Sequence, residues 1–253
     1  MIKFFRKIRQ NLIMENKTGK YFKYAIGEIV LVVIGILIAL WINNLNIKNQ
    51  ENKERETLIT NIKKELNENL NFINTRQQLL DITNKNLIKV LNFSATSQTD
   101  KPIDSLKSYV TKVLTLPTSK LNNSRISSAK TSGKFSLLSD SITTSLTDYE
   151  TSVNNFMGFR ELTTQFFNND WSNLAIGFNS LERFHKSLYP ETNLISHPDL
   201  LLDEQKTILF LKEPTLYQLL HKYYTSHMIE TAWLIELKSK VESTINTIEN
   251  EQL

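Results

Sequence analysis

The sequence predicts an all-α protein with one membrane-spanning helix near its N-terminus and a helical domain after it. Three observations support this fold class. The run from Ile29 to Ile42 contains no charged or polar side chain. Apolar residues then recur at seven-residue spacing from Ile59 to Leu87, as in a long helix with a narrow apolar seam. No stretch alternates as a strand does, and six glycines in 253 residues are few for tight hairpins.

Residues 1–20 form a predicted cytoplasmic segment that is basic and amphipathic. Its apolar residues recur every three to four positions, with lysines and arginines between them. A helix of this kind lies in the lipid interface and is attracted to anionic headgroups. We therefore expect a short interfacial helix before the membrane span, separated from it by the turn-forming residues at 16–19.

Residues 21–44 form the predicted transmembrane helix. Tyr24 and Trp41 would lie about 26 Å apart along a helix that rises 1.5 Å per residue. This distance nearly matches a hydrocarbon core of roughly 30 Å with aromatic rings at both interfaces. Side chains expected to contact lipid include Ile29, Val33, Ile36 and Trp41.

The orientation of the span follows from the charges that flank it. The first 24 residues contain seven basic side chains and one acidic side chain, whereas residues 29–253 contain 23 basic and 24 acidic ones. Short basic flanks stay on the cytoplasmic side, so the N-terminus is expected inside and the large domain in the periplasm. Because the net charge of +4 comes from this flank rather than from a domain face, the sequence does not suggest nucleic-acid binding.

A cleaved signal peptide is the alternative interpretation of a basic start followed by an apolar core. The basic region is long for a signal peptide, however, and no A-x-A-like site follows, because Ala39 leads into bulky residues. We therefore expect an uncleaved signal anchor of the inner membrane. The chain contains no cysteine, which excludes lipoprotein-type cleavage, disulfides and thiolate chemistry.

Residues 45–253 form the predicted periplasmic domain, and its first helix carries the heptad seam. The companion positions of the heptad are occupied by Asn69, Arg76 and Thr83, which are poor residues for a free coiled coil. The pattern favours packing inside an antiparallel helical bundle, with an intermolecular coiled coil as the alternative. We expect the exposed side of this helix to carry Lys63, Glu68, Asn84 and Lys85, and its interior side to carry Ile59, Leu66, Ile73, Leu80 and Leu87.

Proline and turn residues divide the rest of the domain into further helices. A short helix is expected after Pro102, ending at Pro117, and residues 118–134 are the longest expected irregular segment. One helix is expected from Phe135 to about residue 168, another over 171–188, and a short one over 199–212. The last helix begins at Pro214, which suits a first helical turn.

Two stretches resemble a known family. GKYFKYAIGEIVLVVIGILIALWINN (Gly19 to Asn44) is similar to the start of a large family of uncharacterised single-span membrane proteins from Bacteroidetes, whose members have about the length of this chain. TSGKFSLLSDSITTSLTDYE (Thr131 to Glu150) is similar to a second pattern of that family. The resemblance implies a membrane location and a mostly helical outer domain, and it implies no known activity.

Glu28 is the one acidic residue inside the predicted span. An intramembrane carboxylate is a candidate for ion coupling. Glu28 also lies one turn from Tyr24, where it could reach the interface or pair with Lys20 or Lys23. Both interpretations remain open, with the interface or assembly role preferred.

Small residues at Gly27, Gly35 and Ala39 are candidates for close helix–helix contact within the membrane. The four histidines have no metal-ligand spacing, and no nucleophile elbow, phosphate-binding loop or dinucleotide-binding motif is present. We therefore expect no metal, no cofactor and no enzymatic activity.

The sequence favours a non-enzymatic, membrane-anchored scaffold or partner-binding subunit of a membrane complex, in contact with lipid and with a protein partner or a second copy of itself. The first alternative is a small-molecule-sensing or regulatory ectodomain with a ligand pocket between its helices. The second alternative is an ion-coupled, stator-like subunit that uses Glu28.

Overall fold

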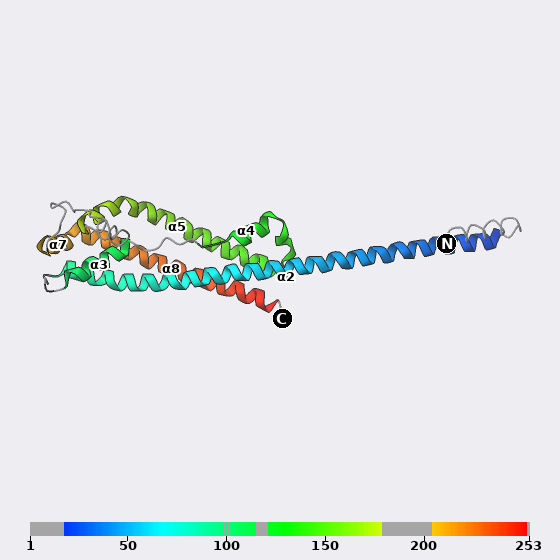
Figure 1. The fold of residues 1–253 in the computed structure, drawn as a ribbon, viewed down its shortest axis with the longest axis horizontal. Helices are drawn as coiled ribbons and strands as arrows, with labels where there is room; N and C mark the ends of the chain where they lie inside the picture. Colours follow the sequence, from blue (N-terminus) through cyan, green and yellow to red (C-terminus); the bar gives the residue numbers. More distant parts are fainter. Residues whose placement is uncertain (1–17, 99, 101, 115–120, 179–203, 252–253) are drawn as a thin grey trace, which may run out of the picture. The chain divides into compact units, whose positions relative to one another are not determined.

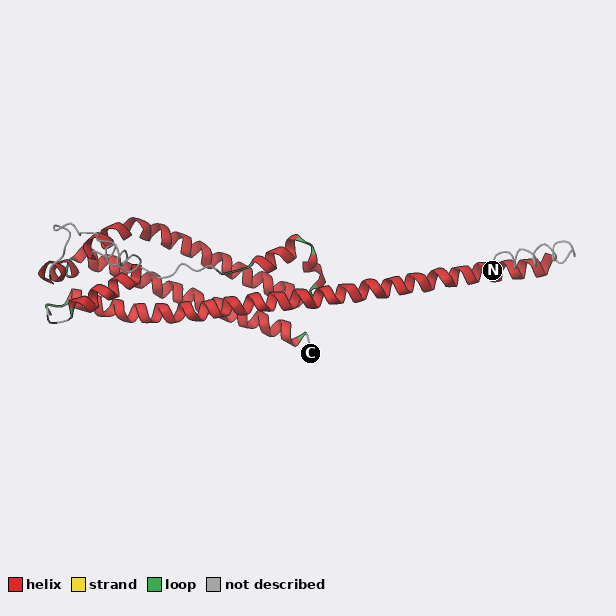
Figure 2. Ribbon diagram, in the orientation of Figure 1, coloured by secondary structure: helices red, strands yellow, loops and turns green. Residues whose placement is uncertain are grey.

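The structure is a computed structural model that describes residues 18–98, 100, 102–114, 121–178 and 204–251. These residues form helices and no strand, so the predicted all-α class is confirmed for them (Figures 1 and 2). The predicted interfacial helix, over residues 1–15, lies outside the described residues. The chain divides into two compact units, residues 1–57 and 58–253.

The first unit contains the N-terminal part of α2, a helix that spans Thr18–Ala95. No proline interrupts α2. The apolar run is exposed throughout, and Trp41 at its end is 64% accessible. Among the described residues α2 is the single helix long and apolar enough to cross a membrane, and its apolar portion begins at Ala25.

The second unit is built on three long helices: the remainder of α2, α5 (Asp140–Phe178) and α8 (Pro214–Asn250). Lys63 on α2 pairs with Glu249 on α8, and Arg76 pairs with Glu230, so the two helices run antiparallel. On α5, Ser145 bonds to Thr244 and Ser152 bonds to Glu236, so α5 is also antiparallel to α8. Figure 1 shows α5 and α8 side by side.

The core of this unit lies along the heptad positions of its long helices. Every predicted interior residue of α2 is at most 2% exposed, which confirms the apolar seam. The same alternation of three- and four-residue steps recurs in the other two helices. The core residues are Ile142, Leu146, Tyr149, Val153 and Phe156 on α5 and Leu234, Leu237, Val241 and Ile248 on α8.

A second apolar cluster surrounds the C-terminal end of α2. It contains residues of α3 (Ile103–Leu114), of α7 (Glu204–Leu211) and of the first turns of α8. Lys212 follows α7 and donates to the carbonyls of Phe93, at 3.0 Å, and of Thr96. These are carbonyls of the last turn of α2 and the residue after it, where a cation satisfies acceptors that the helix leaves open.

Three predicted element boundaries are wrong. The expected irregular segment over 118–134 contains a helix, α4 (Ser124–Thr131). The next long helix begins at Asp140 rather than Phe135, because Gly133 adopts a left-handed conformation and residues 134–137 form a 3-10 turn, η1. Ser139 then caps α5 by accepting the Ile142 N–H at 3.3 Å. Moreover, α5 continues to Phe178 without a break near residue 168.

The prediction for Asn84 is also wrong, since this side chain is buried rather than solvated. Glu68 and Lys85 are exposed as expected, and Lys63 is half-buried. The short predicted helix over 199–212 corresponds to α7, and the last helix begins at Pro214 as expected.

Candidate functional site

The apolar seams of the second unit contain buried polar side chains that face polar side chains of a neighbouring helix. The companion positions that looked unsuitable in the sequence, Asn69, Arg76 and Thr83, are all at most 6% exposed. Asn69 and Arg76 each contact a polar side chain of another helix across the seam. Two polar layers and one docking contact result, and they are the most distinctive chemistry of the described structure.

The first layer is an ion cluster formed by α2, α5 and α8. The Arg76 guanidinium donates to both carboxylate oxygens of Glu230, through Nε at 2.8 Å and through Nη2 at 2.9 Å. The Nε atom of Arg160 lies 3.9 Å from the same carboxylate. Burial lowers the pKa of Arg160, an effect that Glu230 opposes and Arg76 reinforces. One carboxylate thus binds two arginines in an interior where unpaired charge is costly.

The second layer joins Asn84 to His227, whose Nδ1 lies 3.0 Å from Asn84 Oδ1. The imidazole is 5% exposed. Burial lowers the pKa of His227 to about 4, and Glu230 opposes this effect only in part. The ring is therefore neutral near pH 7, and Nδ1 donates to the amide oxygen of Asn84.

The third feature is a contact that docks the start of α4 onto α2. Glu65 is fully buried, and its carboxylate accepts the backbone N–H groups of Arg125, at 2.7 Å, and Ile126, at 3.2 Å, together with the Ser124 hydroxyl at 3.3 Å. These are N–H groups of the first turn of α4, which have no partner within the helix. Glu65 therefore caps α4 from a neighbouring helix, and its negative charge faces the positive end of the helix dipole.

Asn69 extends this contact by one turn of α2. Its amide exchanges two hydrogen bonds with the backbone of Asn122, donating at 2.7 Å and accepting at 2.8 Å. It also donates to the Tyr149 hydroxyl at 2.8 Å, which in turn donates to Asn123 Oδ1 at 3.2 Å. Burial raises the pKa of Tyr149, so the phenol stays protonated and can donate.

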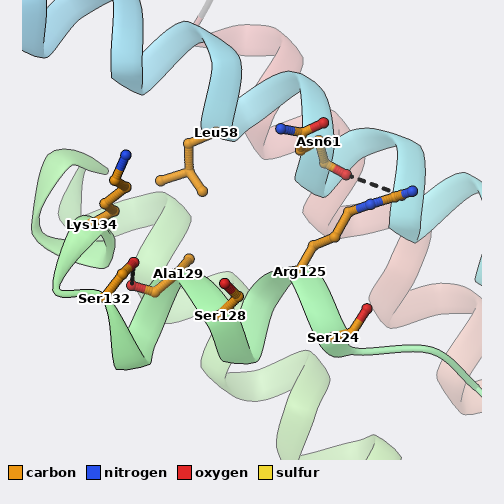
Figure 3. Close-up of a pocket in the computed structure, with 8 residues that line it drawn as sticks. All are labelled: Leu58, Asn61, Ser124, Arg125, Ser128, Ala129, Ser132 and Lys134. Atoms are coloured by element: carbon orange, nitrogen blue, oxygen red, sulfur yellow. Dashed lines mark hydrogen bonds between the residues drawn. The ribbon is translucent and has the colours of Figure 1, made fainter.

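A groove lies beside this contact, between α2 and α4 (Figure 3). Its volume is about 410 Å³. The lining residues are Leu58, Asn61, Ser124, Arg125, Ser128, Ala129, Ser132 and Lys134.

The residues proposed from the sequence belong to the first unit, whereas this site belongs to the second. Ile29, Val33 and Ile36 are exposed, as is Trp41, and Glu28 is half-exposed in α2. A Cβ atom added to Gly27 or Gly35 would meet no atom within 4 Å, so neither glycine makes a close helix contact within this chain. Ala39 is likewise exposed.

Of the four histidines, two lie outside the described residues. His221 is exposed and stacks on Tyr217, with ring centroids 6.1 Å apart, whereas His227 is buried. No group of three or more metal-binding side chains occurs in the part of the chain that the structure describes.

The buried acids and amides of α2 were not predicted as functional residues. The signal was nevertheless present in the sequence, because polar residues fill seam positions of α2 while His227 and Glu230 fill seam positions of α8. What the sequence lacked was the pairing between helices that matches Arg76 with Glu230.

A comparison with known families matches residues 28–187 to a family of unknown function, DUF6090. The chain belongs to this family. The DUF6090 match includes α2 from Glu28, α3, α4 and the described part of α5, and therefore contains the whole contact between Glu65, Asn69 and α4. It ends before α8, which supplies Glu230 and His227. Comparisons with curated proteins and with solved structures found no match to the chain.

Proposed function

We propose that this DUF6090 protein is a non-enzymatic scaffold, anchored in the inner membrane by one helix, that holds a partner protein at the membrane. The observation that carries the proposal is the exposed apolar run of α2, in which every side chain from Ile29 to Ile42 is accessible. Such a surface is stable in lipid and not in water. The N-terminus is cytoplasmic in this proposal, and residues 45–253 form a periplasmic antiparallel bundle.

The second unit supports the scaffold role by its construction. Its three long helices meet through narrow seams, and the polar layers favour one register over shifted ones, because a shift would leave buried charges unpaired. A domain of this kind presents long helix faces of fixed geometry. On α8, the large apolar side chains of Met228, Ile229 and Ile235 are exposed.

Membrane topology can be tested with single-cysteine variants, because the natural chain has no cysteine. Ser97 is exposed just after α2, and Arg6 lies in the basic N-terminal segment. In intact cells with a permeabilised outer membrane, an impermeant maleimide should label Ser97→Cys and not Arg6→Cys. Labelling of Arg6→Cys alone would reverse the proposed orientation, and release of the chain by salt wash would refute the anchor.

The scaffold role can be tested by purification of the full chain in mild detergent after crosslinking in cells. We expect one protein to co-purify in a constant ratio, and the ratio to fall for the double change Met228→Ser and Ile235→Ser. The matched control is Glu242→Ser, an exposed position elsewhere on α8. A chain that purifies alone under all these conditions would contradict the proposal.

A ligand-responsive outer domain is the second candidate, and the groove between α2 and α4 is the observation that favours it. Its volume lies near the lower end of the range of about 300–1,000 Å³ that is typical of small-molecule sites. In this case the domain reports the presence of a ligand to another protein.

A further inference from the structure

The groove between α2 and α4 has an apolar floor and a polar rim. Leu58 and Ala129 supply a floor of buried apolar atoms, being 9% and 3% exposed. The rim is polar and carries three hydroxyl groups at four-residue spacing along α4 and just after it, from Ser124, Ser128 and Ser132. Figure 3 shows Leu58 and Asn61 on α2 opposite this row.

The charges on the lining are all positive. Arg125 and Lys134 are the ionisable residues among the eight, and no carboxylate lines the groove. The groove therefore combines two cations, three hydroxyls and one carboxamide with a small apolar floor. Charge-assisted hydrogen bonds from a guanidinium and an ammonium are strongest when the acceptor is an anion.

Three carboxylates that contact α4 already have partners there. Glu65 accepts backbone N–H groups of α4, so the helix terminus is already capped and offers no anion site of its own. Glu150 pairs with Lys130. Glu68 accepts from Arg125 Nη1, but at 3.4 Å, and the same Nη1 donates to the Asn61 carbonyl at 3.5 Å.

Both of these Arg125 contacts are long for hydrogen bonds between nitrogen and oxygen. A guanidinium has five N–H donors in a planar fork that fits the paired oxygens of a carboxylate or phosphate. An anionic ligand in the groove can therefore bind Arg125 at shorter distance than its present partners do, without removing the cap that Glu65 provides.

We propose that this groove binds a small organic anion, a carboxylate or phosphate monoester with a short apolar body. Arg125 binds the anionic group, the Ser128 hydroxyl donates to one of its remaining oxygens, and Leu58 and Ala129 contact the apolar body. This inference names the ligand class for the ligand-responsive candidate and does not depend on the scaffold role.

The test uses the full chain in nanodiscs of phosphatidylcholine, which carries no net charge. Hexanoate and hexyl phosphate are the two probes, with sodium chloride at equal ionic strength and neutral hexanol as references. A probe that binds the folded state raises the melting temperature by mass action. We expect at least one anionic probe to stabilise the outer domain above both references, and the better probe identifies the anionic group.

Two variants test whether the probes bind in the groove. Arg125→Gln should weaken binding about tenfold or more, because hydrogen bonds to a charged group are lost. Ser128→Leu fills the groove without changing its charge and should also abolish the shift. The control Lys85→Gln removes an exposed cation elsewhere on α2, one paired with Asp81, and should respond like the natural chain.

The outcomes distinguish the alternatives. Equal stabilisation by the anions and by sodium chloride, or an undiminished shift in both groove variants, would overturn the proposal. Stabilisation by phosphatidylglycerol in the nanodisc, with no effect of either soluble probe, would mean that the groove binds a lipid headgroup. That result would also overturn the proposal of a free organic anion. None of these results bears on co-purification of a partner, so the scaffold proposal is judged separately.

Discussion

At the scale of single residues, Glu230 is a buried acid of the second unit with two cationic partners. Its carboxylate is about nine-tenths buried and binds two arginines from two other helices. Desolvation of buried ions offsets most of their mutual attraction, so such a cluster adds little net stability. Its effect is on specificity, because a helix that shifts by one heptad separates Arg76 from its partner.

Replacement of Glu230 by glutamine should therefore be strongly destabilising. The change leaves Arg76 and Arg160 buried without an anion, and loss of one partner of a buried pair costs about 3–5 kcal/mol. Urea unfolding of the full chain, followed by circular dichroism, measures this loss. Glu249→Gln, which removes the exposed partner of Lys63, should change stability by less than about 1 kcal/mol. Equal effects of the two changes would show that the buried cluster has no special role.

His227 should make the stability of the second unit depend on pH. Burial lowers the pKa of His227 from its usual 6.5 to about 4. The unfolded chain binds a proton as pH falls through 6.5 whereas the folded chain does not, so the contribution is fully present above pH 6.5 and is lost as pH falls towards 4. At 1.4 kcal/mol per pKa unit, the loss is roughly 3 kcal/mol.

The variant His227→Asn keeps a side-chain donor towards Asn84 but does not titrate in this range. Unfolding free energies of both proteins, measured between pH 7 and pH 4, should converge as pH falls, because the natural chain loses the histidine contribution and the variant does not. Carboxylates titrate in both proteins, so their effect cancels in the difference. A constant difference across this range would show that the pKa of His227 is the same in the folded and the unfolded chain.

At the scale of elements, α4 shows how a helix of eight residues can depend on a distant side chain. The sequence of α4 is rich in serine and has a weak apolar pattern, and isolated helices of this length are not stable in water. Two of its residues are buried, Ile126 and Ala129. Glu65, fixed on α2, supplies the acceptors that its first turn lacks.

Glu65→Gln should loosen α4 while leaving the long helices in place. The amide oxygen can still accept one hydrogen bond, but the second acceptor and the charge at the helix terminus are lost, and caps are worth about 0.5–2 kcal/mol. Hydrogen exchange should accelerate at the amides of Arg125 and Ile126. Glu68→Gln, an exposed neighbour on the same helix, serves as the control. Unchanged exchange at both amides in Glu65→Gln would mean that α4 is held by its apolar contacts alone.

The same element explains where prediction from sequence succeeded and where it failed. The apolar seam of α2 was predictable because heptad periodicity is local and Leu66 or Leu80 needs no named partner to be buried. The helix α4 was missed because its stability comes from residue 65, about sixty residues earlier in the chain. Asn84 was misplaced for a related reason, since its burial depends on pairing with His227.

At the scale of the whole molecule, basic residues and buried core residues are concentrated in different regions of the chain. Basic residues are concentrated before the apolar run, and the remainder of the chain is close to neutral. The buried core of the described residues begins at Leu58 and lies entirely in the second unit. The described residues of the first unit, from Thr18 to Thr57, therefore contain no buried core, and we expect their apolar surface to be covered by lipid or by another chain.

Self-association within the membrane is the last prediction, and it rests on Gly27, Gly35 and Ala39, which lie at multiples of four residues along one face of α2. Small residues at this spacing allow helix backbones to approach closely. Because a Cβ atom at Gly35 meets nothing within 4 Å, a larger side chain there does not disturb the fold of the single chain. Gly35→Leu should therefore abolish a contact between copies and leave the melting of the second unit unchanged.

Energy transfer between labelled chains in bilayers measures this association. The control Val33→Leu adds volume to α2 two residues away, on a different helix face, and should keep the energy transfer of the natural chain. Equal energy transfer in all three proteins would show that the small-residue face makes no contact between copies. Loss in both variants would mean that association depends on general lipid packing, since a specific interface at Gly35 requires that the two positions differ.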